Sequence, residues 1–276
     1  MATRVSLARQ GDVVFMLLDS PTGLNVLSTD TLRELRDHLA TLADEPSLRG
    51  AVLVGSGHRA FSAGADLNEV ATLTPDTANA FSALGQDVAD AIATLRVPVI
   101  AALNGPAYGG GVELALACDV RVAAAHSHLQ YQAARLGLLP GWGGTQRLPW
   151  LVGPARARRM MLEGERADAE KALAWGLVDD VAPGASLPAV LAERLARWRE
   201  TDPGALAQTK RALNAAWRGD MASERAAFAA CFESGTTQAR IRAWLEAPRA
   251  AVPAAIPQPG SSHNEPRRTL GVAEGA

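Results

Sequence analysis

The stretch that decides the fold reads Val97-Pro-Val-Ile-Ala-Ala-Leu-Asn-Gly-Pro-Ala-Tyr-Gly-Gly-Gly-Val-Glu113. Its apolar first part, Val97–Leu103, is closed by Asn104-Gly105-Pro106 and therefore predicts a buried β-strand. Gly109-Gly-Gly111 then opens a predicted helix over Val112–Cys118, and a further strand is predicted near Val120. A strand that leads through a glycine turn into a helix is typical of an α/β fold with a parallel sheet.

The sequence before this stretch shows the same alternation of strand and helix signals. Val13–Leu18 and Ala51–Val54 are short apolar runs bounded by turn residues, and each predicts a strand. Thr29 or Asp30 is the predicted cap of a helix whose leucines lie on one face, and a long helix is predicted from about Asp76 to Leu95. The N-terminal half is therefore predicted to be α/β.

The sequence after Gly137 has a different character. A loop rich in glycine and proline spans 138–145 and leads into segments that are predicted to be mostly helical to about Ala247. One of these helices is predicted to begin at Pro203, where proline suits the first turn, and to end at Gly219. From Ala251 the chain is rich in Pro, Ala, Gly and Ser without periodicity, which predicts a mobile tail over 251–276.

Composition excludes several classes of function. The 276 residues contain 27 Lys and Arg against 29 Asp and Glu, a balance that argues against a nucleic-acid scaffold or a polybasic membrane binder. Polar residues interrupt the apolar stretch of 97–125, so no membrane helix is predicted. Cys118 and Cys231 cannot form a disulfide framework, and no signal peptide is visible. We therefore expect a cytoplasmic protein.

Several familiar catalytic motifs are missing from the sequence. It contains no nucleophile elbow of the G-x-S-x-G type and no P-loop lysine. Gly109-x-Gly111 matches only half of a dinucleotide fingerprint. His126-x-His128 has no third ligand nearby, so neither a metal site nor a nicotinamide cofactor is expected.

Two glycine-containing turns are more informative, because each follows a predicted strand. The first is Ala60-Phe-Ser-Ala-Gly-Ala-Asp-Leu67 and the second spans 104–113. Ligands of open α/β sheets bind at the carboxyl ends of the strands, and glycine lets peptide N–H groups approach a ligand closely. One N–H group from each turn could hold an oxygen that becomes negative during a reaction. The alternative is that both are simply tight turns.

The sequence resembles the enoyl-CoA hydratase/isomerase (crotonase) superfamily over about Val13 to Ala247. Several strings in the right order carry the resemblance: Pro21-Thr-Gly-Leu-Asn25, Phe61-Ser-Ala-Gly-Ala-Asp66, Val97 to Gly105, Gly109-Gly-Gly-Val-Glu-Leu-Ala115, Cys118-Asp119, Gly137-Leu-Leu-Pro-Gly-Trp-Gly-Gly-Thr-Gln-Arg-Leu148 and Ala174-Trp-Gly-Leu-Val178.

This resemblance implies a spiral of ββα units over 1–200 and a helical C-terminal region over 201–250 that builds trimers, often paired into hexamers. It implies an acyl-CoA substrate, a role in fatty acid metabolism and no cofactor beyond the coenzyme A of the substrate. The N–H groups of Ala65 and Gly110 are the implied oxyanion hole. The candidates for binding coenzyme A are Leu24, Ala63, Asp66 and Leu67, of which Asp66 is expected to act mainly as a structural hydrogen-bonding residue.

The sequence departs from the family pattern at one catalytic position. Hydratases of this family use two glutamates, and the first matches Glu113. The second matches Ala133, which can neither accept nor donate a proton. Three hypotheses stay open: an enoyl-CoA hydratase or isomerase with one carboxylate, a malonyl-type acyl-CoA decarboxylase, or a protein that binds acyl-CoA without turning it over.

Further residues are candidates for lining the substrate pocket. Arg135 could bind a substrate carboxylate, although an arginine at such a position is more often at the surface or in a salt bridge. Tyr131 could replace the missing proton donor, but core packing is the favoured interpretation. Tyr108 lies beside the glycine triplet, and Trp142 lies in a loop similar to that of the decarboxylases.

Overall fold

The main sheet determines where the site lies. The structure is a computed structural model that describes residues 2–183, 186–215, 225, 228–229, 231–233 and 235–247. Among these residues, six strands form the main sheet in the order β1-β2-β3-β4-β6-β9, and all neighbours are parallel except β1 and β2. The strands are β1 (Arg4–Gln10), β2 (Val13–Asp19), β3 (Gly50–Gly55), β4 (Val99–Leu103), β6 (Val120–Ala124) and β9 (Asp180–Ala182).

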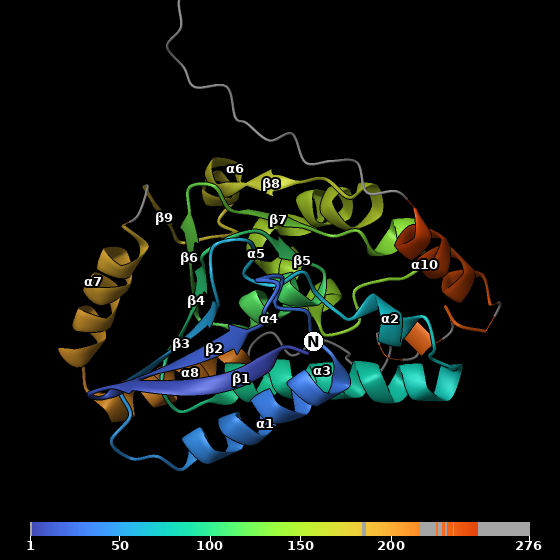
Figure 1. Ribbon diagram of the computed structural model, residues 1–276. Helices are drawn as coiled ribbons and strands as arrows, with labels where there is room; N and C mark the ends of the chain where they lie inside the picture. Colours follow the sequence, from blue (N-terminus) through green and yellow to red (C-terminus); the bar gives the residue numbers. More distant parts are fainter. Residues whose placement is uncertain are drawn as a thin grey trace, which may run out of the picture. The chain divides into compact units, whose positions relative to one another are not determined.

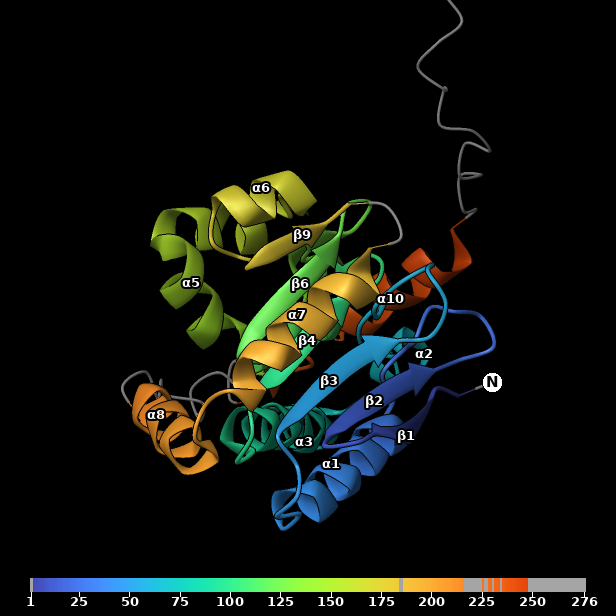
Figure 2. The same cartoon turned by 90° about the vertical axis from the view of Figure 1, so that its left-hand side faces the viewer.

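Both faces of the central strands of this sheet are buried, whereas the edge strand β1 is mostly exposed, and successive residues of a strand face opposite sides. In β3, Ala51 and Leu53 belong to the larger core, whereas Val52 belongs to a smaller one on the other face. Helices α1 (Thr29–Ala43) and α3 (Pro75–Thr94) cover the larger core, and α7 (Leu187–Arg199) covers the smaller one (Figure 2). Burial on both faces explains why the central strands are continuous apolar runs.

A smaller sheet lies beside the carboxyl ends of the main strands. In the described part of the chain its strands are β5 (Ala107–Tyr108), β7 (His128–Gln130) and β8 (Ala167–Asp168). The helices around it are α2 (Leu67–Val70), α4 (Gly110–Ala117), α5 (Gly144–Arg158) and α6 (Ala169–Ala174), together with the short turns of helix η1 (Ala133–Leu136) and η2 (Arg159–Glu163). Figure 1 shows α4 in the middle of this arrangement, following β5.

Most predicted elements are confirmed, with small shifts at their ends. The cap of α1 is Ser28 rather than Thr29 or Asp30: its backbone is extended, and its side chain accepts from the Thr31 amide. Helix α4 begins at Gly110, because Gly109, with φ of 45°, turns the chain before it. The predicted mostly helical region also contains β8 and β9, which pair with strands from the first half.

The described residues up to Leu245 belong to one unit, which spans Met1–Leu245. It includes α8 (Pro203–Ala215), whose start at Pro203 is confirmed, and most of α10 (Thr236–Glu246). The predicted division at residue 200 falls within this unit and stays a prediction. The predicted helix end at Gly219 and the tail over 251–276 lie outside the described residues. Every helix in the described part is too short or too polar to span a lipid bilayer.

Candidate active site

Helix α4 places a carboxylate inside the protein. All of its residues are buried, and Glu113 is only 3% exposed. Its Oε1 atom accepts hydrogen bonds from the backbone N–H groups of Trp142, at 2.7 Å, and Gly144, at 2.8 Å. These amides replace the hydrogen bonds that water would donate, and they hold the carboxylate in one position.

The loop that binds Glu113 ends in the first turn of α5. Gly143 caps this helix with a left-handed φ of 98°, and Gly144 is the first helical residue. The carboxylate therefore lies at the positive end of the helix dipole, which stabilises its ionised form. A Cβ on Gly144 would lie 2.7 Å from the Tyr131 hydroxyl and 2.9 Å from Glu113 Oε1, so both side chains reach the same point of the loop.

The two glycine turns predicted from the sequence lie against each other. The Tyr108 N–H donates to the Ser62 carbonyl at 3.0 Å. A Cβ on Gly64 would lie 2.7 Å from the Tyr108 carbonyl oxygen and 3.3 Å from the Gly110 nitrogen. Within the described ranges, neither the Ala65 nor the Gly110 N–H donates to a protein acceptor. The geometry thus brings together the turns that carry both candidate donors, beside the helix that carries Glu113.

A buried asparagine positions the first of these turns. Asn25 is fully buried with a φ of 51°, and its Nδ2 donates to the Ala60 carbonyl at 2.9 Å. Its own carbonyl accepts from the Ser62 hydroxyl at 2.8 Å, and Ser62 Oγ in turn accepts from the Gly64 amide at 3.1 Å. Sequence reasoning did not assign this role. The signal available was the position of Asn25 at the end of the string Pro21–Asn25.

Comparison with known proteins identifies the family of this chain. The family model for enoyl-CoA hydratase/isomerase matches residues 8–250. A crotonyl-CoA hydratase from Syntrophomonas wolfei is 35% identical over 246 residues, which are 88% of this chain and 95% of that protein. A short-chain-enoyl-CoA hydratase from Clostridium acetobutylicum is 32% identical, with 88% and 94% covered. The chain belongs to the enoyl-CoA hydratase/isomerase family.

Solved structures of this family confirm the predicted crotonase fold. An enoyl-CoA hydratase from Bacillus anthracis matches with a TM-score of 0.75 and 34% identity, covering 83% of this chain and 90% of that one. An enoyl-CoA hydratase/isomerase from Mycobacterium paratuberculosis matches with a TM-score of 0.81 and 27% identity, covering 88% and 99%. The expected assembly into trimers or hexamers stays a prediction.

The other candidates for the substrate pocket differ in whether they lie beside Glu113. Trp142 is 2% exposed and belongs to the loop that binds Glu113, and Tyr131 is 1% exposed with its hydroxyl beside Gly144 of that loop. Ala133 begins η1 and is half-buried. Arg135 is exposed, and its guanidinium lies along the turn at Gly164, where a Cβ would be 3.5 Å from Nε. The structure thus joins Tyr131 and Trp142 to Glu113, whereas Arg135 lies at the surface.

Tyr108 forms a pair with a buried histidine. Its hydroxyl and His128 Nε2 are hydrogen-bonded at 2.8 Å, and the rings meet edge to face with centroids 5.2 Å apart. The pKa of His128 is lowered to about 4, mainly by burial and in addition by the charge of Arg166, whereas Asp168 acts in the opposite direction. Burial also raises the pKa of Tyr108. His128 is therefore neutral near pH 7.

The candidates for binding coenzyme A lie around the first glycine turn. The Ala63 amide donates to the Leu24 carbonyl at 2.8 Å, which links the turn to the segment after β2. Leu67 begins α2, and Asp66 caps it by accepting from the Asn68 amide at 2.9 Å. This contact is the structural role expected for Asp66. Binding of coenzyme A by these residues stays a prediction.

Proposed function

We propose that this protein converts an enoyl-CoA thioester through an enolate, with Glu113 as the one carboxylate that moves the proton. A single observation carries the proposal: a buried carboxylate, fixed by the Trp142 and Gly144 amides, lies on the helix whose first residue is Gly110. The proposed thioester oxygen accepts from the Ala65 and Gly110 N–H groups. Each such donor stabilises developing negative charge by about 3 kcal/mol in related enzyme sites.

The chemistry required of Glu113 is the same in hydration and in isomerisation. In isomerisation, its carboxylate takes a proton from carbon 2 of a 3-enoyl-CoA, and the same group returns that proton to carbon 4. In hydration, it orients the water that adds to carbon 3 and helps to deliver a proton to carbon 2. A positioned acid or base of this kind contributes about a hundredfold to ten-thousandfold to the rate.

Ala133 sets the balance between these reactions. Hydration needs groups that both activate water and supply a proton, which two carboxylates can divide between them. Ala133 carries no proton, so Glu113 performs both tasks in sequence, and hydration is the slower of the two reactions. Relatives named as a crotonyl-CoA hydratase and a short-chain-enoyl-CoA hydratase support a substrate with a double bond next to the thioester.

The test compares substrates of three reaction classes. Purified protein is incubated with crotonyl-CoA, a 3-enoyl-CoA and methylmalonyl-CoA. The products are separated by chromatography, which distinguishes the isomeric 2-enoyl and 3-enoyl thioesters, and are identified by mass spectrometry. We expect conversion of the enoyl thioesters. If methylmalonyl-CoA loses carbon dioxide and neither enoyl thioester is converted, the protein is a decarboxylase and the proposal is wrong. Binding of all three without turnover would show a protein that only holds acyl-CoA.

A further inference from the structure

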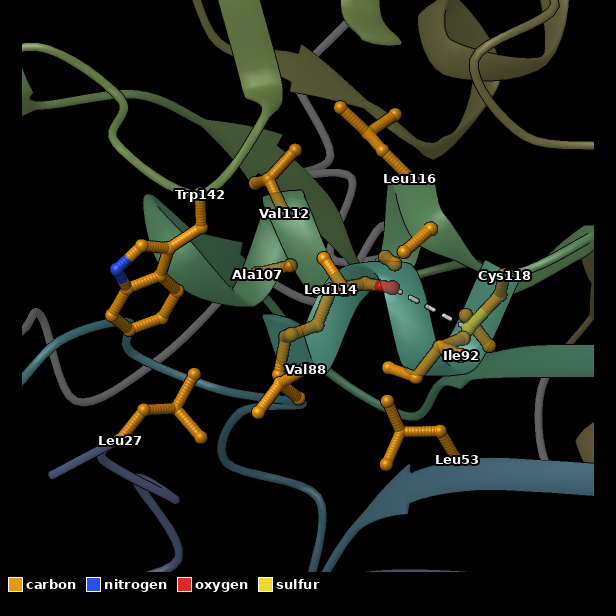
Figure 3. Close-up of a cluster of buried hydrophobic side chains, with 14 of the residues drawn as sticks. Leu27, Leu53, Val88, Ile92, Ala107, Val112, Leu114, Leu116, Cys118 and Trp142 are labelled. Carbon is orange, nitrogen blue, oxygen red and sulfur yellow. Dashed lines mark hydrogen bonds between the residues drawn. The ribbon is translucent and has the colours of Figure 1, made fainter. Parts of the chain in front are cut away.

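The indole of Trp142 occupies the space directly beside Gly110. A Cβ on Gly110 would lie 2.1 Å from the six-membered part of the ring, so the ring lies against the bare backbone of that residue. Figure 3 shows the indole extending from its loop beside Val112 toward Leu27. Since the proposed thioester oxygen binds at the Gly110 amide, the ring adjoins the position of the acyl group.

The ring is held firmly on its other sides. A Cβ on Gly85 of α3 would lie 2.2 Å from Trp142 Cδ1, and Phe81 packs edge to face with ring centroids 5.4 Å apart. The Gly141 carbonyl before it accepts from the Ser82 hydroxyl at 2.6 Å. The backbone of Trp142 itself donates to Glu113 and accepts from Arg147. With backbone and ring both fixed, the indole cannot turn aside without breaking this packing.

We propose that Trp142 forms the end wall of the acyl pocket and restricts the enzyme to short acyl chains. The inference rests on the proposed function. A bulky, immobile ring beside the reacting carbonyl leaves no room for a chain that continues in that direction. Each methylene group that a hydrophobic pocket accepts or excludes changes discrimination by about tenfold or more. The residue thus has two separate roles: its backbone amide positions Glu113, and its side chain limits the substrate.

The Trp142→Ala variant separates these roles, because it keeps the backbone N–H and removes the ring. We expect the ratio of kcat/KM for trans-2-octenoyl-CoA to that for crotonyl-CoA to rise at least tenfold. Trp150→Ala is the matched control, since Trp150 is 65% exposed on the neighbouring part of α5; its ratio stays at the wild-type value. A ratio for Trp142→Ala within twofold of the wild type would overturn the proposal.

Two additions keep the test decisive. If Trp142→Ala does not fold, Trp142→Leu and Trp142→Phe are compared, and the ratio is expected to rise more for leucine, the smaller residue. Titration calorimetry with butyryl-CoA and octanoyl-CoA reads chain-length selection without turnover. If the wild type binds these thioesters but converts no enoyl-CoA, the proposed function fails, while the preference for butyryl-CoA and its loss in Trp142→Ala still decide the role of Trp142.

Discussion

At the scale of single residues, the proposed chemistry depends on how Glu113 is held. A carboxylate that is removed from water is stabilised only if other donors replace its hydration. The Trp142 and Gly144 amides, at 2.7 and 2.8 Å, supply such donors without adding a competing charge. The two amides therefore fix the carboxylate in one position. In the proposed mechanism, Ala133 stands at the position expected for a second carboxylate and supplies none.

Restoring that second group is a prediction at the same scale. In Ala133→Glu, we expect the rate of crotonyl-CoA hydration to rise about tenfold or more, because activation of water and proton delivery are then divided between two carboxylates. Isomerisation of a 3-enoyl-CoA, which needs one carboxylate, changes less. The absorbance of the conjugated enoyl thioester, which hydration removes and isomerisation creates, measures both rates. Ala134→Glu is the control, since Ala134 is exposed; equal effects of the two substitutions would contradict the prediction.

At the scale of elements, glycines let α3, α4 and the loop before α5 meet around one ring. Gly85 and Gly110 both face the Trp142 indole at distances that a side chain would not allow. Gly144 likewise leaves room for Glu113 and Tyr131. Because of these close contacts, the position of the loop that binds Glu113 depends on how α3 and α4 pack against it.

The packing of the Trp142 ring on Gly85 predicts that removing the ring relieves the destabilisation caused by a side chain at position 85. Gly85→Ala places a methyl group in the Trp142 ring, and we expect it to lower the free energy of unfolding by about 1–3 kcal/mol through overpacking. In the Trp142→Ala variant, the added methyl group of Gly85→Ala occupies the space that the ring has left, and the free energy of unfolding changes little. Urea unfolding of the two single variants and the double variant measures the coupling. Additive effects would show that residues 85 and 142 do not interact.

The elements also show what the sequence could and could not predict. The strands of the main sheet that are buried on both faces were predicted from their apolar runs. Strand β1 was missed, because Val5 alone of its residues is buried and it carries no apolar run. The glycine turns and Glu113 were identified by their motifs. The contact between Gly64 and Gly110, and the packing of Trp142 on Gly85, join residues distant in sequence and needed the structure.

At the scale of the whole molecule, the buried pair of Tyr108 and His128 links stability to pH. The pKa of His128 is lowered from 6.5 to about 4 in the folded protein. Between these values the unfolded chain binds a proton that the folded protein excludes. Stability from this residue is therefore complete above about pH 6.5 and is lost as the pH falls toward 4.

We accordingly expect the free energy of unfolding to fall between pH 7 and pH 4.5, and to fall less in His128→Gln. Urea titrations at several pH values measure this difference. His126→Gln is the matched control, because His126 is exposed and its Nε2 is hydrogen-bonded to the Asn104 carbonyl at 3.2 Å. The prediction fails if His128→Gln and the wild type lose stability in parallel over this range.

The most direct test of the account is the turnover of an enoyl-CoA by Glu113→Gln. The amide oxygen of glutamine can still accept from the Trp142 and Gly144 amides, so the fold is kept while the proton carrier is lost. We predict that kcat falls about a hundredfold to ten-thousandfold, with thermal unfolding near that of the wild type. Glu193→Gln, on the exposed face of α7, keeps full activity. Full activity of Glu113→Gln would contradict the central claim.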